Sequence, residues 1–191
     1  MLHPKRRTNR LLLSTCLSGL LLLASMPMAW ADSTTATTTV SAGSLTESNA
    51  TTPAPSVTLD GTDQTATYSL TITVTDATGS GNGWNLTITS TTFTTGGGSP
   101  YTLSTTASHI TGVTSSCVAN TTCTNPTNAL TYPIGVPAAG TAPTAVKIFK
   151  AAADTGLGTF TVTPSVAIAV PADTYAGSYS STVTLAIVSG P

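Results

Sequence analysis

Apolar and polar residues alternate along much of the chain beyond residue 56. Apolar side chains stand at every second position in two stretches: Leu70, Ile72 and Val74, then Trp84, Leu86 and Ile88. Successive side chains of a β-strand point to opposite faces, so a period of two predicts strands with one buried face. Residues 65–75 and 84–89 are separated by a glycine-rich turn, and the pattern predicts that they form a β-hairpin.

Further strand candidates follow at short intervals, with turn residues between them. They are residues 57–59, 101–103, 109–113, 129–132, 146–151, 160–162, 166–170 and 179–188. No stretch beyond residue 31 has the period of an amphipathic helix. The sequence therefore predicts an all-β fold, an antiparallel β-sandwich with Greek-key-like connections and about eight or more strands; a barrel-like closure of the same strands is the alternative.

The first 31 residues have the layout of a secretory signal peptide. A basic start precedes an apolar run over residues 11–23, and Ala29-Trp30-Ala31 supplies the small residues that a signal peptidase reads. This run is too short to span a membrane comfortably. We expect cleavage before Asp32 and an exported, extracellular protein with no membrane span. A lipid anchor at Cys16 and a twin-arginine signal are the less favoured alternatives.

Residues 32–56 are rich in threonine and serine and poor in large apolar side chains. Two interpretations are open: a flexible spacer, or a short edge strand over residues 38–45. Residues 57–191 are long enough for one domain with a single core. Charged residues make up only 7% of the chain, so we expect a strand surface that consists mainly of hydroxyl groups.

The charge beyond residue 31 is negative. Two lysines, Lys147 and Lys150, are set against seven carboxylates, a formal charge of −5. A partner that presents phosphates, either nucleic acid or anionic lipid, would require a basic surface on the protein. We therefore expect neither partner, and no simple electrostatic attachment to acidic wall polymers.

Cys117 and Cys123 are the two cysteines that remain once the leader is removed. In an exported protein they predict a disulfide that pins a short loop. A zinc site would need more ligands than these thiols and His109 supply. Asp60 and Asp63 lack the repeated oxygen ligands of a calcium-binding loop. No metal and no cofactor is expected.

No pair of residues suited to acid–base catalysis stands out. The aspartates lie mainly in predicted turns, where their side chains accept hydrogen bonds from the backbone. His109 is expected at a loop or a strand edge. We therefore expect a protein that is not an enzyme, and an extracellular hydrolase is the least favoured class.

Two stretches of the chain resemble the motifs of the WxL family of surface proteins. The first runs through Asp76, Gly79, Gly83, Trp84, Leu86 and Thr87. The second, near the C-terminus, resembles the distal motif of the family, but Leu185, Ala186 and Ile187 stand where a second Trp-x-Leu is expected. The resemblance covers residues 57–191. It implies a β-sandwich that attaches non-covalently to the cell wall of Gram-positive and related bacteria.

Two roles are open for Trp84. Its indole either packs in the core, with the N–H bonded to a carbonyl, or lies on the surface beside Tyr68, Tyr175 or Tyr179 and stacks on a glycan ring. In the second case, Trp84 and Leu86 are the candidate ligand-binding residues.

Two functions follow from these features. The preferred one is an exported, non-enzymatic surface protein that associates with the cell envelope through peptidoglycan, another wall polymer or other surface proteins. The alternative is a homo-oligomeric subunit of a surface fibre or layer, assembled by pairing of edge strands, to which the segment after Asp32 would donate a strand.

Overall fold

The computed structural model describes residues 35–49 and 53–190; the predicted signal peptide, residues 1–31, lies outside them. The described residues contain ten strands and no helix, which confirms the predicted all-β sandwich. The strands are β1 (Leu45–Asn49), β2 (Gln64–Ser69), β3 (Ile72–Asp76), β4 (Trp84–Thr91), β5 (Ser108–Cys117), β6 (Ile134–Gly135), β7 (Ala138–Ala139), β8 (Val146–Ala151), β9 (Gly158–Val170) and β10 (Val183–Ser189). All ten belong to one compact unit, Val40–Pro191.

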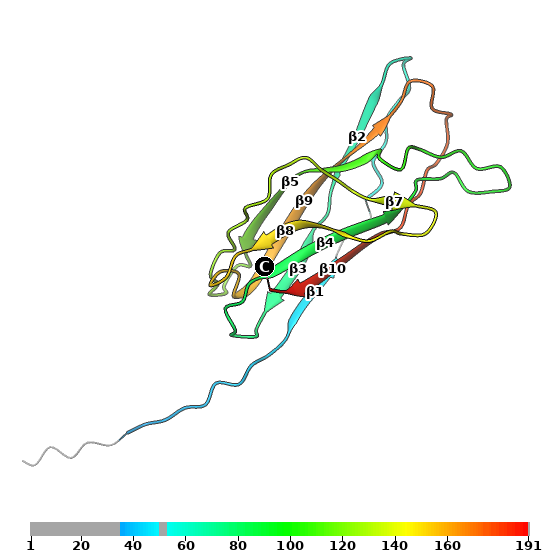
Figure 1. Cartoon of the computed structure of the whole chain (residues 1–191). Coiled ribbons are helices and arrows are strands. Elements are labelled where there is room, and N and C mark those ends of the chain that lie inside the picture. The colour runs from blue at the N-terminus through cyan, green and yellow to red at the C-terminus, as the bar shows by residue number, and fades with distance from the viewer. Residues whose placement is uncertain (1–34, 50–52, 191) are drawn as a thin grey trace, which may run out of the picture. The chain divides into compact units, whose positions relative to one another are not determined.

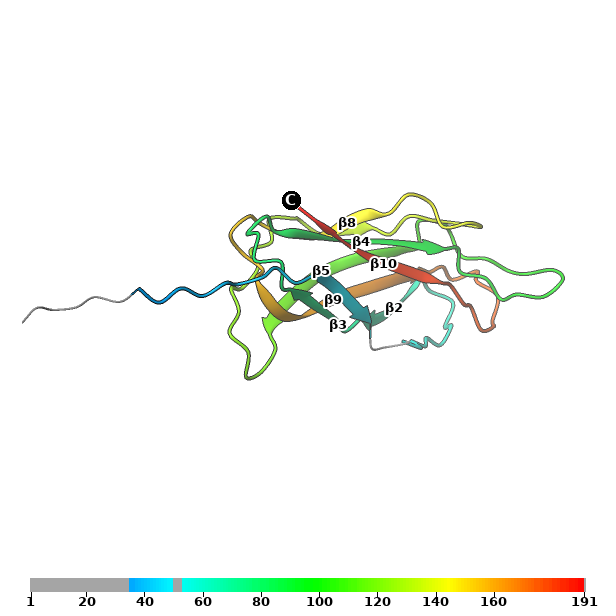
Figure 2. The same ribbon diagram turned by 90° about the horizontal axis from the view of Figure 1, so that it is seen from below.

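The strands form two sheets that pack face to face. The larger sheet has six strands in the order β1-β3-β9-β5-β6, and β2 pairs with a second part of β9. The smaller sheet has four strands: β4 lies at its centre and pairs with β10, β7 and β8. Figure 2 shows β4, β8 and β10 on one side of the molecule and β2, β3 and β9 on the other. All strand pairs are antiparallel except β4 with β7.

The long strand β9 organises the larger sheet. Its first half pairs with β3 and its second half with β2, while β5 runs along its opposite edge. Pro164 lies at the middle of β9 and is buried. A proline has no N–H to donate to a neighbouring strand. β2 and β3 are interrupted at this point, where the Leu70 N–H donates to the Pro164 carbonyl (3.0 Å).

The predicted hairpin over residues 65–89 is wrong. β3 pairs with β1 and β9 in the larger sheet, whereas β4 pairs with β10, β7 and β8 in the smaller one. The glycine-rich turn therefore carries the chain from one sheet to the other. Alternation of apolar and polar residues predicts a strand with one buried face, and both β3 and β4 have such a face. The alternation does not identify the neighbouring strand to which each is hydrogen-bonded.

Several shorter predictions are also corrected. Residues 57–59 and 129–132 form no strand, and residues 101–103 keep only a bridge between Thr102 and Thr94. The two strands predicted over residues 160–162 and 166–170 are one continuous strand, β9, and the interruption lies between its neighbours β2 and β3 instead. The strand predicted within residues 38–45 lies at Leu45–Asn49, where it pairs with β3, and the last strand begins at Val183 rather than at residue 179.

The core falls into two clusters of buried side chains. The larger fills the sandwich between β3, β4, β8 and β9 and includes Trp84, Phe149 and Phe160. The smaller lies toward the opposite end of β4 and consists of Ala66, Leu103, Ala107, Ile168 and Val170, with Phe93 and Tyr179 packed against it. β1 and β10 are both edge strands, and they lie beside each other on the same side of the sandwich (Figure 1).

No helix among the described residues is long and apolar enough to cross a membrane.

Candidate functional site

Trp84 lies at the centre of the larger core cluster and has 0% of its surface exposed. Its ring stacks on Phe149 of β8, with centroids 5.3 Å apart, and packs against Phe160 of β9 at 6.4 Å. The indole N–H donates to the Gly156 carbonyl (3.0 Å). Since Phe149 and Phe160 belong to different sheets, this one side chain joins the two layers.

Two glycines make room for this arrangement. Gly83 has a φ of +70°, and a Cβ there would collide with the carbonyl oxygens of Ala151 and Ala152. Gly156 has a φ of +77°, and a Cβ there would lie 2.6 Å from the Trp84 Nε1. Glycine alone adopts such a backbone conformation readily and lets another group approach so closely. The Gly83-Trp84 pair is thus explained by packing.

The polar residues of the first motif hold the chain around Trp84. The Asp76 carboxylate accepts hydrogen bonds from the Thr78 N–H (3.0 Å) and hydroxyl (2.7 Å), which starts the turn between the sheets. The Thr87 hydroxyl donates to the Ala186 carbonyl of β10 (3.1 Å). The Asn85 side-chain amide donates to the Gly190 carbonyl. The contacts of Asn85 and Thr87 connect β4 to the C-terminal segment.

The two WxL-like stretches are therefore neighbours in one sheet. In the register of β4 with β10, Leu86 lies opposite Ile187 and Ile88 opposite Leu185. Leu185 occupies the position expected for a second tryptophan, and it is half-buried against the main core. Because Leu185 replaces the expected second tryptophan, Trp84 is the tryptophan around which this core is built.

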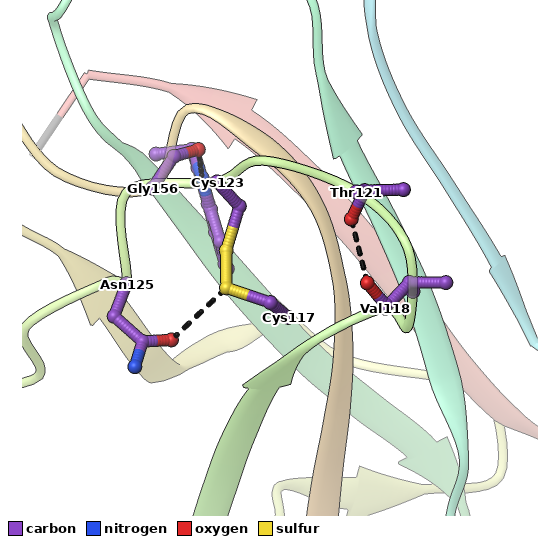
Figure 3. Close-up of a disulfide and its surroundings, with 7 residues drawn as sticks. Cys117, Val118, Thr121, Cys123, Asn125 and Gly156 are labelled. Carbon is purple, nitrogen blue, oxygen red and sulfur yellow. Dashed lines mark hydrogen bonds between the residues drawn. A yellow bond between two sulfur atoms is a disulfide. The ribbon is translucent and has the colours of Figure 1, made fainter.

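The predicted disulfide is present between Cys117, at the end of β5, and Cys123 in the following loop (Figure 3), with their Cα atoms 6.0 Å apart. The loop returns toward the start of β9: the Gly156 N–H donates to the Thr124 carbonyl (2.8 Å), and the Thr124 N–H donates to the Leu157 carbonyl (2.9 Å). Thr124, the residue after Cys123, thus holds Gly156 in place, and the Gly156 carbonyl accepts the hydrogen bond from the Trp84 N–H.

A groove of about 1110 Å³ opens at the end of the sandwich where the smaller core cluster lies. Its apolar wall comes from both sheets and includes Tyr68 of β2, Ile168 of β9 and Val183 of β10. The segments 53–59 and 174–181 form its rim. β4 runs from Trp84 at one end to Thr91 at the other, and Phe93, just beyond that second end, lines the groove. The groove and Trp84 are therefore at opposite ends of the central strand.

Two exposed tyrosines extend the groove onto the surface. Tyr175 lines it and stacks on Tyr101, with ring centroids 4.0 Å apart and an interplanar angle of 13°. They are 61% and 46% exposed, respectively. The Tyr179 hydroxyl donates to the Tyr175 carbonyl (2.9 Å), which fixes the loop that carries this ring. Figure 2 shows the two loops, residues 92–107 and 171–182, at the same end of the molecule.

The groove carries no ionised group among its described lining residues. Burial raises the pKa of the Tyr68 phenol, so this side chain stays neutral. Asp60 and Asp173 each adjoin a lining residue in the sequence but do not line the groove. Asp60 accepts hydrogen bonds from the Thr62 hydroxyl and N–H and from Gln64, and these bonds lower its pKa. The polar atoms available to a ligand are hydroxyl and amide groups.

The other candidate residues are not brought together. His109 lies in β5 opposite Gly135 and Ala167, away from the cysteines. Asp63 accepts the Ala172 N–H (2.9 Å), so it links the loop before β2 to the segment after β9. Within residues 35–49 and 53–190, no group of three or more His, Cys, Asp or Glu side chains has an arrangement that could hold a metal ion.

Comparison with protein-family models matches residues 32–191 to the WxL domain, described as surface cell wall-binding. The chain belongs to the WxL family. This membership confirms the resemblance and the cell-surface location that it implied. Searches of curated proteins and of solved structures returned no match.

The WxL motif residues predicted to contact a ligand, Trp84 and Leu86, are both fully buried. In this structure neither presents a surface on which a glycan could stack. The geometry matches the other predicted role of Trp84, a core indole with its N–H bonded to a carbonyl. The groove was missed because its residues come from four separate parts of the sequence; the clustering of Tyr175 and Tyr179 was the one local signal.

Substitution of Gly156 by alanine should lower the free energy of unfolding more than the same change at Gly61. Both glycines have positive φ, but a Cβ on Gly61 meets nothing within 4 Å, whereas one on Gly156 meets the Trp84 indole. The left-handed conformation costs both variants about 1–2 kcal/mol, and overpacking costs Gly156→Ala about 1–3 kcal/mol more. Denaturant unfolding measures the difference, and equal losses in the two variants would contradict the role assigned to Gly156.

Removal of the disulfide, by Cys117→Ser with Cys123→Ser, should lower the free energy of unfolding by about 2 kcal/mol, because the closed loop is short. The circular dichroism spectrum should remain that of a β-protein, since the backbone hydrogen bonds of Thr124 with Gly156 and Leu157 hold the loop without the bridge. Unfolding of the parent with and without reducing agent provides the control. Loss of the fold on reduction would show that the bridge is more than a local constraint.

Proposed function

We propose that this WxL protein binds peptidoglycan without catalysing a reaction on it. Family membership over residues 32–191 is the observation that supports the proposal, because the family is described as surface cell wall-binding. The surface chemistry is compatible with a carbohydrate-rich wall. The groove offers aromatic, hydroxyl and amide groups, the kinds of group that recognise neutral polar ligands.

A non-enzymatic role is supported by the placement of the ionisable side chains. The carboxylates with described partners, Asp60, Asp63 and Asp76, accept hydrogen bonds within turns or between segments. None of the three shares a cavity with a partner suited to proton transfer in the described structure. Binding, rather than hydrolysis, is the activity that this arrangement supports.

Assembly into a fibre is the second candidate. β1 and β10 are edge strands, and residues 35–44 are exposed and form no strand. Edge strands present unpaired backbone groups that a strand from another copy can use. Size-exclusion chromatography separates the candidates, because a fibre subunit forms polymers at concentrations where a wall-binding monomer does not.

Residues 32–191 should co-sediment with purified, insoluble peptidoglycan. A Trp84→Phe variant that circular dichroism shows to be folded should co-sediment equally well, because the indole is buried. The supernatant should contain no released muropeptides after prolonged incubation. Failure of the folded parent to pellet would refute peptidoglycan binding, and soluble sugar fragments would refute the non-enzymatic role.

A further inference from the structure

Four of the five tyrosines of this chain lie at one end of the sandwich. Of its five tyrosines, three line the groove, Tyr68, Tyr175 and Tyr179, and Tyr101 stacks on Tyr175. Large aromatic rings left in water cost free energy, and an exposed pair next to a groove is a feature of binding surfaces. Neither Tyr101 nor Tyr175 contributes to the core clusters. The exposed positions of Tyr101 and Tyr175 are therefore not explained by the stability of the fold.

We propose that the groove and its stacked tyrosines bind a neutral glycan strand, with a sugar ring packed on the Tyr101–Tyr175 face. The inference rests on the proposed function and makes it specific. The glycan backbone of peptidoglycan, rather than its peptide stems, is the part recognised, and the contact surface is at the end of β4 opposite the buried Trp84.

The shape and chemistry of the groove fit such a ligand. Its volume of about 1110 Å³ is slightly above the usual range for small-molecule sites, which suits a few linked sugar rings. The apolar faces of pyranose rings pack on aromatic rings, and their hydroxyl and acetamido groups exchange hydrogen bonds with neutral polar groups. Thr58, Thr174 and Ser178 supply hydroxyl groups along the rim.

The charge of the groove also favours a glycan over other wall components. No Asp, Glu, Lys, Arg or His side chain lines it among the described residues. A peptide stem or a teichoic acid presents ionised groups, and a groove with a largely apolar wall and no opposite charge would penalise them. The glycan backbone of alternating N-acetylated sugars needs no opposite charge on the protein, because stacking and hydrogen bonds to neutral groups are sufficient to bind it.

A strand donated by a second copy fits the groove less well. The exposed segment 35–44 consists of threonine, serine, alanine and glycine apart from Val40, its one large apolar side chain. The groove wall includes Phe93, Leu103, Ile168 and Val170. Strand donation gains stability from alternate side chains that fill such pockets. Alanine and threonine are too small to do so.

The test compares residues 32–191 with three variants. Tyr101→Ala with Tyr175→Ala removes the stacking face. Tyr101→Phe with Tyr175→Phe keeps both rings. Val188→Ala is the matched control, because Val188 is an exposed apolar side chain (52%) in β10 at the Trp84 end, outside the groove. Each protein is titrated with a soluble β-1,4-linked N-acetylglucosamine hexamer by calorimetry, and each is co-sedimented with peptidoglycan.

We expect the double alanine variant to bind the hexamer roughly tenfold more weakly or worse and to pellet less with peptidoglycan. The double phenylalanine variant and Val188→Ala should bind within about threefold of the parent, less than a 1 kcal/mol change. All four proteins should have the same thermal unfolding midpoint, since the two tyrosines are exposed.

Each of the other possible outcomes refutes a different claim. A parent that does not pellet with peptidoglycan refutes the proposed function itself. A parent that pellets, together with a double alanine variant that pellets equally, overturns this site and leaves the function standing. Binding to peptidoglycan but not to the hexamer overturns the glycan as the ligand. A shift of the double alanine variant from oligomer to monomer in size-exclusion chromatography shows instead that the groove joins copies of this chain.

Discussion

Burial of the Trp84 indole between the two sheets is the contact on which the rest of the structure depends. The ring lies on Phe149 from its own sheet and against Phe160 from the other, so it contributes to the packing of both layers. Removal of a fully buried aromatic side chain costs about 3–5 kcal/mol, a large part of the stability of a domain of this size. Its N–H is satisfied by the Gly156 carbonyl, so the core contains no unpaired donor at this position.

Other features of the chain support that contact. Gly156 is held by Thr124, the residue after Cys123, so the disulfide loop fixes the acceptor of the Trp84 hydrogen bond. Gly83 lets the chain enter β4 against the carbonyls of Ala151 and Ala152. β10 then pairs along the whole of β4 up to Ser90. The signature residues of the WxL family thus form a structural unit in this chain, and the surface that we propose for recognition lies elsewhere.

Alternation of apolar and polar residues was enough to predict the fold class and, as one of two alternatives, the buried role of Trp84; the two cysteines left beyond the leader predicted the disulfide. The alternation was not enough to predict strand partners. β3 and β4 are consecutive strands and have the same period, yet the connection between them crosses from one sheet to the other. Pairing depends on contacts between residues distant in sequence, such as Ile72 with Val162, which local patterns do not encode. The groove depends on such contacts too, because Tyr101 and Tyr175 meet only after folding.

Trp84 is the one tryptophan in residues 32–191. Its fluorescence therefore tests directly whether the motif residue lies in the core and whether the glycan binds at another place on the protein. The measurement is the emission spectrum of this region, and its quenching by acrylamide, with and without saturating soluble glycan hexamer. The account predicts a blue-shifted emission that acrylamide quenches poorly and that the hexamer leaves unchanged. An emission typical of water-exposed indole, with quenching from which the hexamer protects it, would contradict the account and make Trp84 a contact residue.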